Sequence, residues 1–296
     1  MPDEQDFLAH RGLVLRLAYD VTGSWADAED VTQQAYLRWA GVTGQIRNPR
    51  AYLARIAVNL SLDVLAARDR TGYPGPFLPE PVPTGPGADE ALQSADEVEI
   101  ALMVVLGTLT PLERAAFLLH DVFAFTHAEV AQMLGREPAA VRQLAARARG
   151  HVEARRPGGT ATRAPAEVDP AELMALTGLF LAAARAGDVD TLRRHLTDDV
   201  AFVGDGGGKR PTARRPIVGA DKVARFVVGI VDRLDQHSRL TVVEANHRPA
   251  LVLLQGTVLD QVFWLVLQGG RISQILSVRN PDKLEGLAAA LPSALG

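Results

Sequence analysis

The stretch that decides the fold of the first half of the chain is residues 126–149, THAEVAQMLGREPAAVRQLAARAR. Thr126 and Glu129 form the Thr-x-x-Glu pattern of a capping box, as Thr110 and Glu113 do earlier in the chain, and each box predicts that a helix begins there. Gly135 suits the left-handed backbone conformation that commonly ends a helix. Pro138 can open a second helix, because proline is tolerated in a first turn. A short helix, a glycine turn and a second helix predict a helix-turn-helix.

The second of these helices carries polar side chains suited to reading DNA outside its apolar stripe, namely Arg142, Gln143 and Arg147. Arginine and glutamine can each make paired hydrogen bonds to a base edge in the major groove. The alternative is an ordinary solvated helix whose last-turn arginines interact favourably with the helix dipole. The two helix-start signals and the glycine turn favour DNA binding, although Glu137 at the helix entry would repel phosphates.

The composition narrows the class of protein. A chain of 296 residues, 47% of them hydrophobic, is expected to form two or three globular domains. It has no cysteine, which excludes disulfides and cysteine-ligated zinc and favours a reducing cytoplasm. The acidic start is unlike a signal peptide, and the apolar runs are far shorter than the roughly 20 residues of a membrane span. We therefore expect a soluble, cytoplasmic protein without membrane contact.

The charge limits how such a protein meets DNA. The net charge of the chain is −4, and residues 1–156 hold 15 Arg, no Lys and 20 Asp or Glu, a net charge of −5. The overall field therefore does not attract phosphates. DNA binding has to come from local patches or from delivery by a partner.

The periodicity of apolar residues divides the chain into domains. Residues 1–70 and 89–156 are expected to be all-helical, and the proline-rich segment 71–88 between them is expected to be an extended, stiff linker. A second, looser linker is expected at 157–168. Residues 169–296 combine helical patterns with a succession of strand-like segments, which predicts an antiparallel sheet with helices on one side, an α+β domain.

A helix in the first domain has a carboxylate- and amide-rich face, made of Asp27, Glu29, Asp30, Gln33 and Gln34. Such a face is either plainly solvated or a docking surface for a basic partner. Composition alone does not decide between the two.

Longer stretches carry a family resemblance. The segments 27–39, DAEDVTQQAYLRW, and 48–59, NPRAYLARIAVN, together with Thr126–Leu134, Gly135 and Val141-Arg142, resemble regions 2 and 4 of extracytoplasmic-function (ECF) sigma factors. The resemblance covers roughly residues 5–156, in the family's order. It implies a region 2 helical bundle at 1–70 and a region 4 helix-turn-helix at 89–156. It also implies an alternative sigma factor that binds core RNA polymerase and directs promoter-specific transcription initiation.

The resemblance also implies roles for individual residues. The polymerase clamp would be bound by Asp27, Glu29, Asp30, Gln33 and Gln34. A flipped base of the −10 element would be held by the loop 41–48, with Arg47, Asn48 and Arg50. The −35 element would be read by Arg142, Gln143 and Arg147, with its specificity affected by Glu137, where the family more often has a small polar residue.

The last domain resembles the SnoaL-like cone that extends one ECF subgroup, where it stands in place of a separate anti-sigma factor. Three motifs carry this likeness: Phe77, Leu78, Pro79, Glu80 and Pro81; Asp205, Gly206, Gly207, Gly208 and Lys209; and Asn280, Pro281, Asp282 and Lys283. Phe77 stands where tryptophan is more usual. We expect the second and third motifs to form one surface that grips the proline-rich linker, as an intramolecular regulatory contact.

Two rival functions stay open at this point. One is a helix-turn-helix regulator that acts without polymerase. The other is a small-molecule enzyme or sensor built on the cone, in which His195, Asp205, Asp260 and Trp264 could meet as an acid/base group. A lone histidine at a helix end is more often structural. We expect no enzyme activity, no catalytic residue, no cofactor and no metal.

Overall fold

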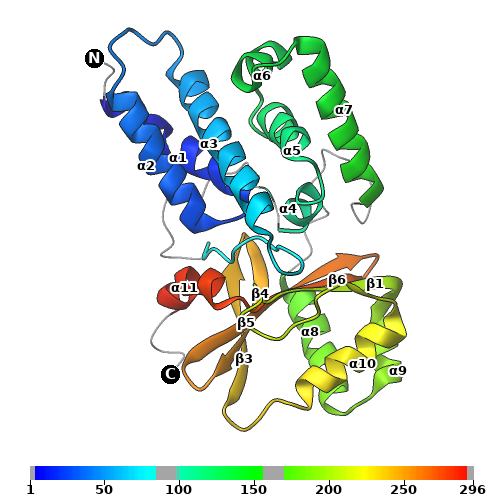
Figure 1. Cartoon of the computed structure of the whole chain (residues 1–296). Helices are drawn as coiled ribbons and strands as arrows, with labels where there is room; N and C mark the ends of the chain where they lie inside the picture. Colours follow the sequence, from blue (N-terminus) through cyan, green and yellow to red (C-terminus); the bar gives the residue numbers. More distant parts are fainter. Residues whose placement is uncertain (1–3, 85–97, 99, 156–169, 292–296) are drawn as a thin grey trace. The chain divides into compact units, whose positions relative to one another are not determined.

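The structure is a computed structural model, and it describes residues 4–84, 98, 100–155 and 170–291 (Figure 1). The expected linker at 157–168 lies outside the described residues. The chain forms two compact units. The first comprises Met1–Gly72 with Gly87–Arg156, and the second comprises Tyr73–Pro86 with Pro157–Gly296. Most of the proline-rich linker thus folds with the C-terminal domain.

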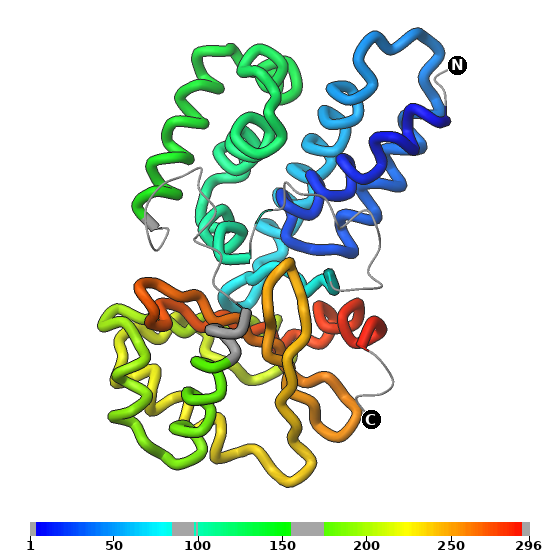
Figure 2. Tube along the Cα trace, turned by 180° about the vertical axis from the view of Figure 1, so that it is seen from behind, coloured from blue at the N-terminus to red at the C-terminus, as the bar shows by residue number. Residues whose placement is uncertain are grey.

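Three helices form the first half of unit 1: α1 (Glu4–Thr22), α2 (Trp25–Ala40) and α3 (Pro49–Thr71). Local signals set their starts, because the side chains of Ser24 and Asn48 accept hydrogen bonds from the first turns of α2 and α3. Apolar stripes on the three helices pack together, and both views show the helices side by side (Figures 1 and 2).

The second half of unit 1 contains α4 (Ile100–Leu106), α5 (Pro111–Phe117), a π-helical turn (Leu118–Val122), α6 (His127–Leu134) and α7 (Pro138–Arg155). Both predicted capping boxes, Thr110 with Glu113 and Thr126 with Glu129, are present. Gly135 ends α6 in the left-handed conformation at φ 61° and ψ 42°. The predicted helix-turn-helix is therefore confirmed, although α7 runs beyond its expected end near residue 149.

Two arginines fasten the C-terminal end of α1. Arg68 of α3 donates to the carbonyl of Thr22, and Arg114 of α5 donates to the carbonyl of Val21, both at 2.7 Å. These carbonyls have no partner within their own helix. Burial, and secondarily the charge of Arg68, lowers the pKa of Arg114 to about 10, so Arg114 stays charged at neutral pH.

Unit 2 has one sheet with helices against it. The helices are α8 (Pro170–Arg185), α9 (Val189–His195), α10 (Ala220–Val231) and α11 (Pro281–Ala290). The strands are β1 (Leu196–Asp205), β2 (Ile217–Val218), β3 (Ser238–Ala245), β4 (Arg248–Gln255), β5 (Val258–Gln268) and β6 (Arg271–Val278). The order across the sheet is β2-β1-β6-β5-β4-β3. This is the α+β domain that the sequence predicts.

One pairing departs from the antiparallel sheet expected. Strands β3 to β6 are joined by tight turns and pair antiparallel, but β1 pairs with β6 in parallel, with Asp205 opposite Val278. Parallel neighbours need a long crossover, which the chain between β1 and β6 provides. As a result, the C-terminal ends of β1 and β6 lie side by side at the same end of the sheet. The segments that follow them, which contain the glycine motif and Asn280, are therefore neighbours.

The conformation of Gly135 yields a testable prediction. Gly135→Ala would force alanine to φ +61° with nothing within 4 Å of its Cβ, so the cost of about 1 kcal/mol is conformational. We expect hydrogen exchange of the α6 and α7 amides to quicken about fivefold. The control is Gly150→Ala within α7, which has equally open space and should slow exchange or leave it unchanged. Equal acceleration in both variants would contradict the left-handed cap.

Candidate functional site

The first candidate site is the outward face of α2. Glu29, Asp30, Gln33 and Gln34 are all exposed, whereas Ala28, Val31, Thr32, Ala35 and Trp39 point into the bundle. Leu37 continues the face one turn on, and its side chain is 69% exposed. Sequence reasoning missed Leu37, although its spacing of seven from Asp30 places it outside the buried stripe.

Asp27 differs from its neighbours on α2. Its carboxylate accepts a hydrogen bond of 2.6 Å from Arg68, and this ion pair is only partly exposed. Because Arg68 also caps α1, Asp27 ties α2 to α1 and α3. The structure therefore separates Asp27, which has an internal partner, from the four exposed polar residues of the face.

The three residues expected at the −10 element have different surroundings. Arg47 is exposed, and Asn48 is engaged through its side-chain oxygen in capping α3. Arg50 donates to the carbonyl of Phe123 at 2.6 Å, and its guanidinium lies 4.1 Å from the centre of the Phe125 ring. In this arrangement Arg50 is held by the segment between α5 and α6, so it would have to leave these partners to meet a base.

The helix-turn-helix presents two of its three expected reading residues. Arg142 and Gln143 are exposed on α7, while Val141, Ala145 and Ala148 are buried. Arg147 instead donates to Glu113 at 2.9 Å, although its side chain is still 58% exposed. Hydrogen bonds from Thr110, assisted by Arg147, hold the pKa of Glu113 below its usual range, so this ion pair persists at neutral pH.

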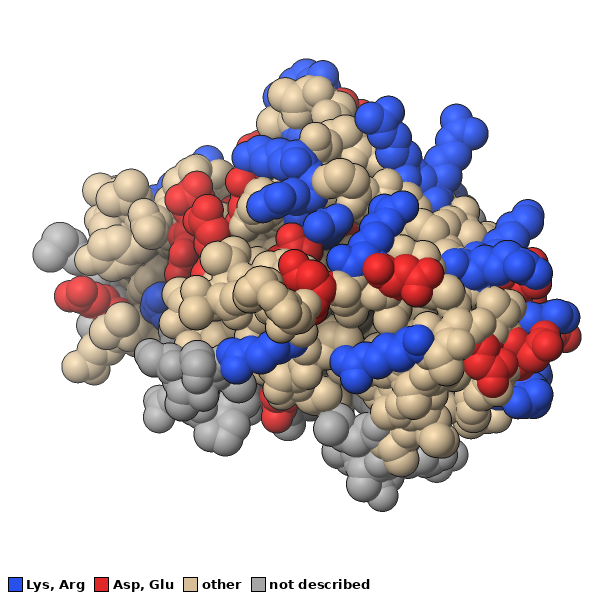
Figure 3. All heavy atoms as spheres, turned by 90° about the horizontal axis from the view of Figure 1, so that it is seen from below, with Lys and Arg blue, Asp and Glu red and all other residues tan. Residues whose placement is uncertain are grey.

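His127 adds little charge near this surface. Burial, and then the neighbouring His120 whose ring centre is 3.8 Å away, lowers the pKa of His127 at the start of α6. At neutral pH this residue therefore adds little to the positive charge that the arginines supply. Figure 3 views the molecule from below Figure 1, not from the helix-turn-helix, and on that face Lys and Arg side chains lie among Asp and Glu side chains.

The second candidate site lies in unit 2, where the segment after α3 runs along the C-terminal domain beside α11 (Figures 1 and 2). Lys283 of α11 is only 6% exposed and Asp205 is fully buried. The Lys283 ammonium donates to the Asp205 carboxylate at 2.7 Å and to the carbonyl of Leu78 at 2.5 Å. It also lies 3.1 Å from the centre of the Phe77 ring, a cation–π contact.

Asp205 accepts two further hydrogen bonds from the same segment. The backbone N–H of Leu78 donates to its carboxylate at 2.9 Å, and the Tyr73 hydroxyl donates at 2.5 Å. Asn280 in turn donates to the Tyr73 hydroxyl at 3.0 Å. One carboxylate thus joins the linker, the end of β1 and α11.

The glycine motif is shaped by close approach. Gly207 and Gly208 have positive φ angles of 59° and 72°. A Cβ on Gly207 would lie 2.3 Å from the Asn280 side chain, and one on Gly208 would lie 2.7 Å from the Pro74 ring. The N–H of Gly207 donates to Asp205, so this loop holds a carboxylate of its own chain. Lys209 forms an exposed ion pair with Asp282.

The turn between β3 and β4 holds the other end of the segment. Asn246 donates its backbone N–H to the carbonyl of Val82 at 2.8 Å, accepts from the N–H of Val82 at 3.2 Å, and donates to the carbonyl of Glu80. Thr84 bonds to Glu244 and to the N–H of His247. The sequence marks this stretch only as a turn, so these linker contacts were missed.

Comparisons with known proteins agree with these two units. The sequence matches the family "Sigma-70 region 2" over residues 7–71 and "Sigma-70, region 4" over residues 99–152. The ECF RNA polymerase sigma factor SigJ of Mycobacterium tuberculosis is 39% identical, over 95% of this chain and 93% of its own length. SigI of the same species, a probable ECF sigma factor, is 29% identical over 96% of this chain and 95% of its own length.

A solved structure extends the likeness to the whole fold. The crystal structure of M. tuberculosis SigJ covers 96% of this chain and 99% of its own, at a TM-score of 0.74 and 36% identity. The chain belongs to the ECF sigma factors. As an ECF sigma factor it directs promoter-specific transcription initiation, and its partners are core RNA polymerase and promoter DNA. This confirms the prediction of a sigma factor that directs promoter-specific transcription initiation.

The acid/base group considered for this sigma factor does not assemble. Asp205 binds Lys283, Asp260 pairs with Arg279, and the Trp264 indole donates to the carbonyl of Ala245. His195 ends α9 and has no hydrogen bond to any of them. Within the described ranges, no three His, Asp or Glu side chains are grouped as metal ligands, and no helix is long and apolar enough to cross a membrane.

The Lys283–Asp205 pair gives the second prediction. Lys283→Met leaves a buried carboxylate without its charge partner, which costs about 3–5 kcal/mol. We expect exchange of the Leu78 N–H, which donates to that carboxylate, to quicken more than about a hundredfold. Lys222→Met, at an exposed position of α10, is the control and should change nothing. In the double variant Asp205→Asn/Lys283→Met the effect should be smaller than the sum of the two single effects.

Proposed function

We propose that the exposed face of α2 is the polymerase-binding surface of this sigma factor. The side chains of four polar residues are exposed and take no part in the packing of the bundle, namely Glu29, Asp30, Gln33 and Gln34. Leu37 adds an exposed apolar side chain to the same face. A rim of charge around an apolar side chain is typical of a protein interface. Asp27 supports the face from below through Arg68.

We further propose that Arg142 and Gln143 read the −35 element, and that Arg47, Asn48 and Arg50 contact the −10 element. Arg142 and Gln143 are exposed near the start of α7, the second helix of the helix-turn-helix, which is where residues that read the major groove lie. Arg147 joins them only if DNA competes with Glu113. We propose that the protein acts in the cytoplasm, because RNA polymerase and promoter DNA are found there.

Charge reversal on α2 tests the polymerase-binding proposal. Glu29→Lys/Asp30→Lys should weaken association with cognate core RNA polymerase at least tenfold, because a docking face for a basic partner becomes repulsive. The matched control is Asp63→Lys/Asp69→Lys, which makes the same charge change at exposed positions of α3. Affinity is measured with labelled full-length protein at two salt concentrations. Equal loss in both double variants would assign the effect to net charge and reject the face.

The C-terminal domain, we propose, regulates the sigma domains through its grip on the linker and does so without catalysis. The observation that carries this is a set of hydrogen bonds with the segment 73–84, in which Asp205 accepts from it and Lys283 and Asn246 donate to it. Twelve residues can span up to about 40 Å when extended and free. Fixing them on unit 2 shortens the tether available between regions 2 and 4, which must reach two separate promoter elements.

Release of the linker should therefore raise transcription. Asn246→Ala and Lys283→Met each remove linker contacts without touching the faces proposed for polymerase or DNA, so we expect more transcript from a cognate promoter in a purified system. Lys222→Met serves as control. A truncation before Pro281, which removes α11, should change activity while promoter selection is kept. Unaltered transcript levels in Asn246→Ala, in Lys283→Met and in the truncated protein, together called the grip variants, would refute regulation through the linker.

A further inference from the structure

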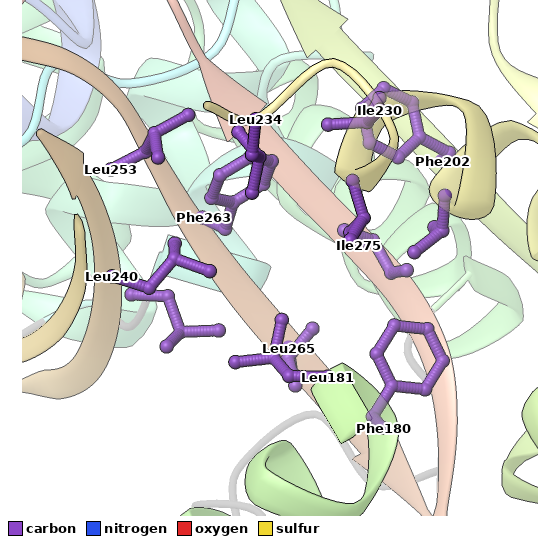
Figure 4. A pocket seen from close by; sticks show the side chains of 13 residues that line it. Phe180, Leu181, Phe202, Ile230, Leu234, Leu240, Leu253, Phe263, Leu265 and Ile275 are labelled. Atoms are coloured by element: carbon purple, nitrogen blue, oxygen red, sulfur yellow. The ribbon is translucent and has the colours of Figure 1, made fainter. Parts of the chain in front are cut away.

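The C-terminal domain contains an apolar chamber of about 60 Å³ between its sheet and its helices. Side chains from α8, from α10 and its C-terminal end, and from β4, β5 and β6 face one another across it (Figure 4). Every residue that lines it is hydrophobic, including Phe180, Ile230, Leu234, Leu253, Phe263 and Ile275. A chamber of this kind favours hydrocarbon and rejects polar groups, which would lose their hydrogen bonds to water.

A second, larger chamber adjoins the first. It measures about 650 Å³, within the range of about 300–1,000 Å³ that is usual for small-molecule sites. Phe202, Ile230, Leu234 and Leu253 line both chambers, so the two lie side by side and share part of their lining. The lining of this outer chamber differs in containing polar and charged side chains as well as apolar ones.

The outer chamber has an excess of positive charge. Four arginines line it, and its single carboxylate, Asp260, is paired with Arg279 at 3.0 Å. Arg225 is paired with Asp221 on its own helix. In the part of the chain that the structure describes, neither Arg215 nor Arg233 has an ion-pair partner. The outer chamber therefore has two exposed guanidiniums, those of Arg215 and Arg233, that no carboxylate of the described residues engages.

We propose that these chambers bind a small amphipathic carboxylate, with its hydrocarbon part in the inner chamber and its carboxylate beside Arg215 and Arg233. Guanidinium groups bind carboxylates through charge-assisted hydrogen bonds, often in pairs. A neutral apolar molecule would leave the arginines unused, and a uniformly polar anion would leave the inner chamber unfilled. The ligand class thus follows from the combination of the two chambers.

The proposed ligand site is connected to the residues that hold the linker through two consecutive residues, Arg279 and Asn280. Arg279 lines the outer chamber, and its backbone N–H and that of Asn280 both donate to the backbone carbonyl of Asp205, at 2.7 and 3.1 Å. The side chain of Asp205 holds Leu78 and Lys283. Because Arg279 lines the same chamber as Arg215 and Arg233, a carboxylate bound beside those two would also attract Arg279, and a shift of Arg279 away from Asp260 would move this junction. This coupling rests on the regulatory role proposed above, whereas binding itself does not.

Calorimetry on the full-length protein tests the site with three probes: octanoate, octanamide with the same chain and a neutral head, and acetate with the head alone. We expect octanoate to bind with one-to-one stoichiometry and at least tenfold more tightly than either of the others. Arg215→Gln/Arg233→Gln should reduce octanoate binding at least tenfold and leave octanamide binding unchanged. Arg239→Gln, at an exposed position of β3, is the matched control.

A second variant addresses the inner chamber. Val231→Phe adds volume to its wall, so it should weaken octanoate and octanamide alike. Absence of octanoate binding, uptake of many equivalents without saturation, or equal affinity for octanoate and octanamide would each overturn the proposal. So would unchanged octanoate affinity in the double arginine variant, since the charge would then play no part.

Hydrogen exchange of the Leu78 N–H, with and without saturating octanoate, tests the coupling separately. Faster exchange with octanoate supports communication between the chambers and the linker. One-to-one binding with no change in exchange would reject the coupling and leave the ligand site standing. A failure of the regulatory proposal is recognised independently, because the grip variants are assayed for transcription with no carboxylate present.

Discussion

One buried ammonium group organises the C-terminal unit. The Lys283 ammonium group loses its hydration when it is buried. Its charge is compensated by the Asp205 carboxylate, the Leu78 carbonyl and the face of the Phe77 ring. A buried ion pair adds little net stability, because desolvation offsets the attraction, but losing either partner is costly. Such a pair therefore acts as a specificity device. The pair is satisfied only when the linker, the end of β1 and α11 are in this arrangement, and any other arrangement leaves a buried charge without its partner.

The linker is built to be gripped in this way. Its prolines at 79, 81 and 83 have no N–H and keep the chain extended. Three N–H groups within and beside this run are used, because those of Leu78, Val82 and Thr84 donate to Asp205, Asn246 and Glu244. Proline thus limits the entropy lost on docking, while the alternate residues supply the hydrogen bonds.

How far the sequence predicts this structure depends on the range of each interaction. The helix starts at Thr110 and Thr126 and the turn at Gly135 are local, so four or five residues are enough to define them. The parallel pairing of β1 with β6 is not local, and the succession of hairpin-like segments in the sequence predicts only antiparallel neighbours. Likewise, no spacing rule connects Asp205 with Leu78. Their predicted proximity came from family resemblance, and the contribution of Asn246 was missed altogether.

The arginines of the sigma domains show why polymerase is needed. Arg68 and Arg114 are committed to the end of α1, Arg147 and Arg149 to Glu113 and Asp121, and Arg50 to Phe123. Arginines used internally contribute little to attracting phosphate, and the region carries a net charge of −5. Arg142 and Gln143 can discriminate bases, but discrimination is separate from affinity. A sigma factor of this composition selects the promoter, and the affinity for DNA has to be supplied largely by the polymerase it accompanies.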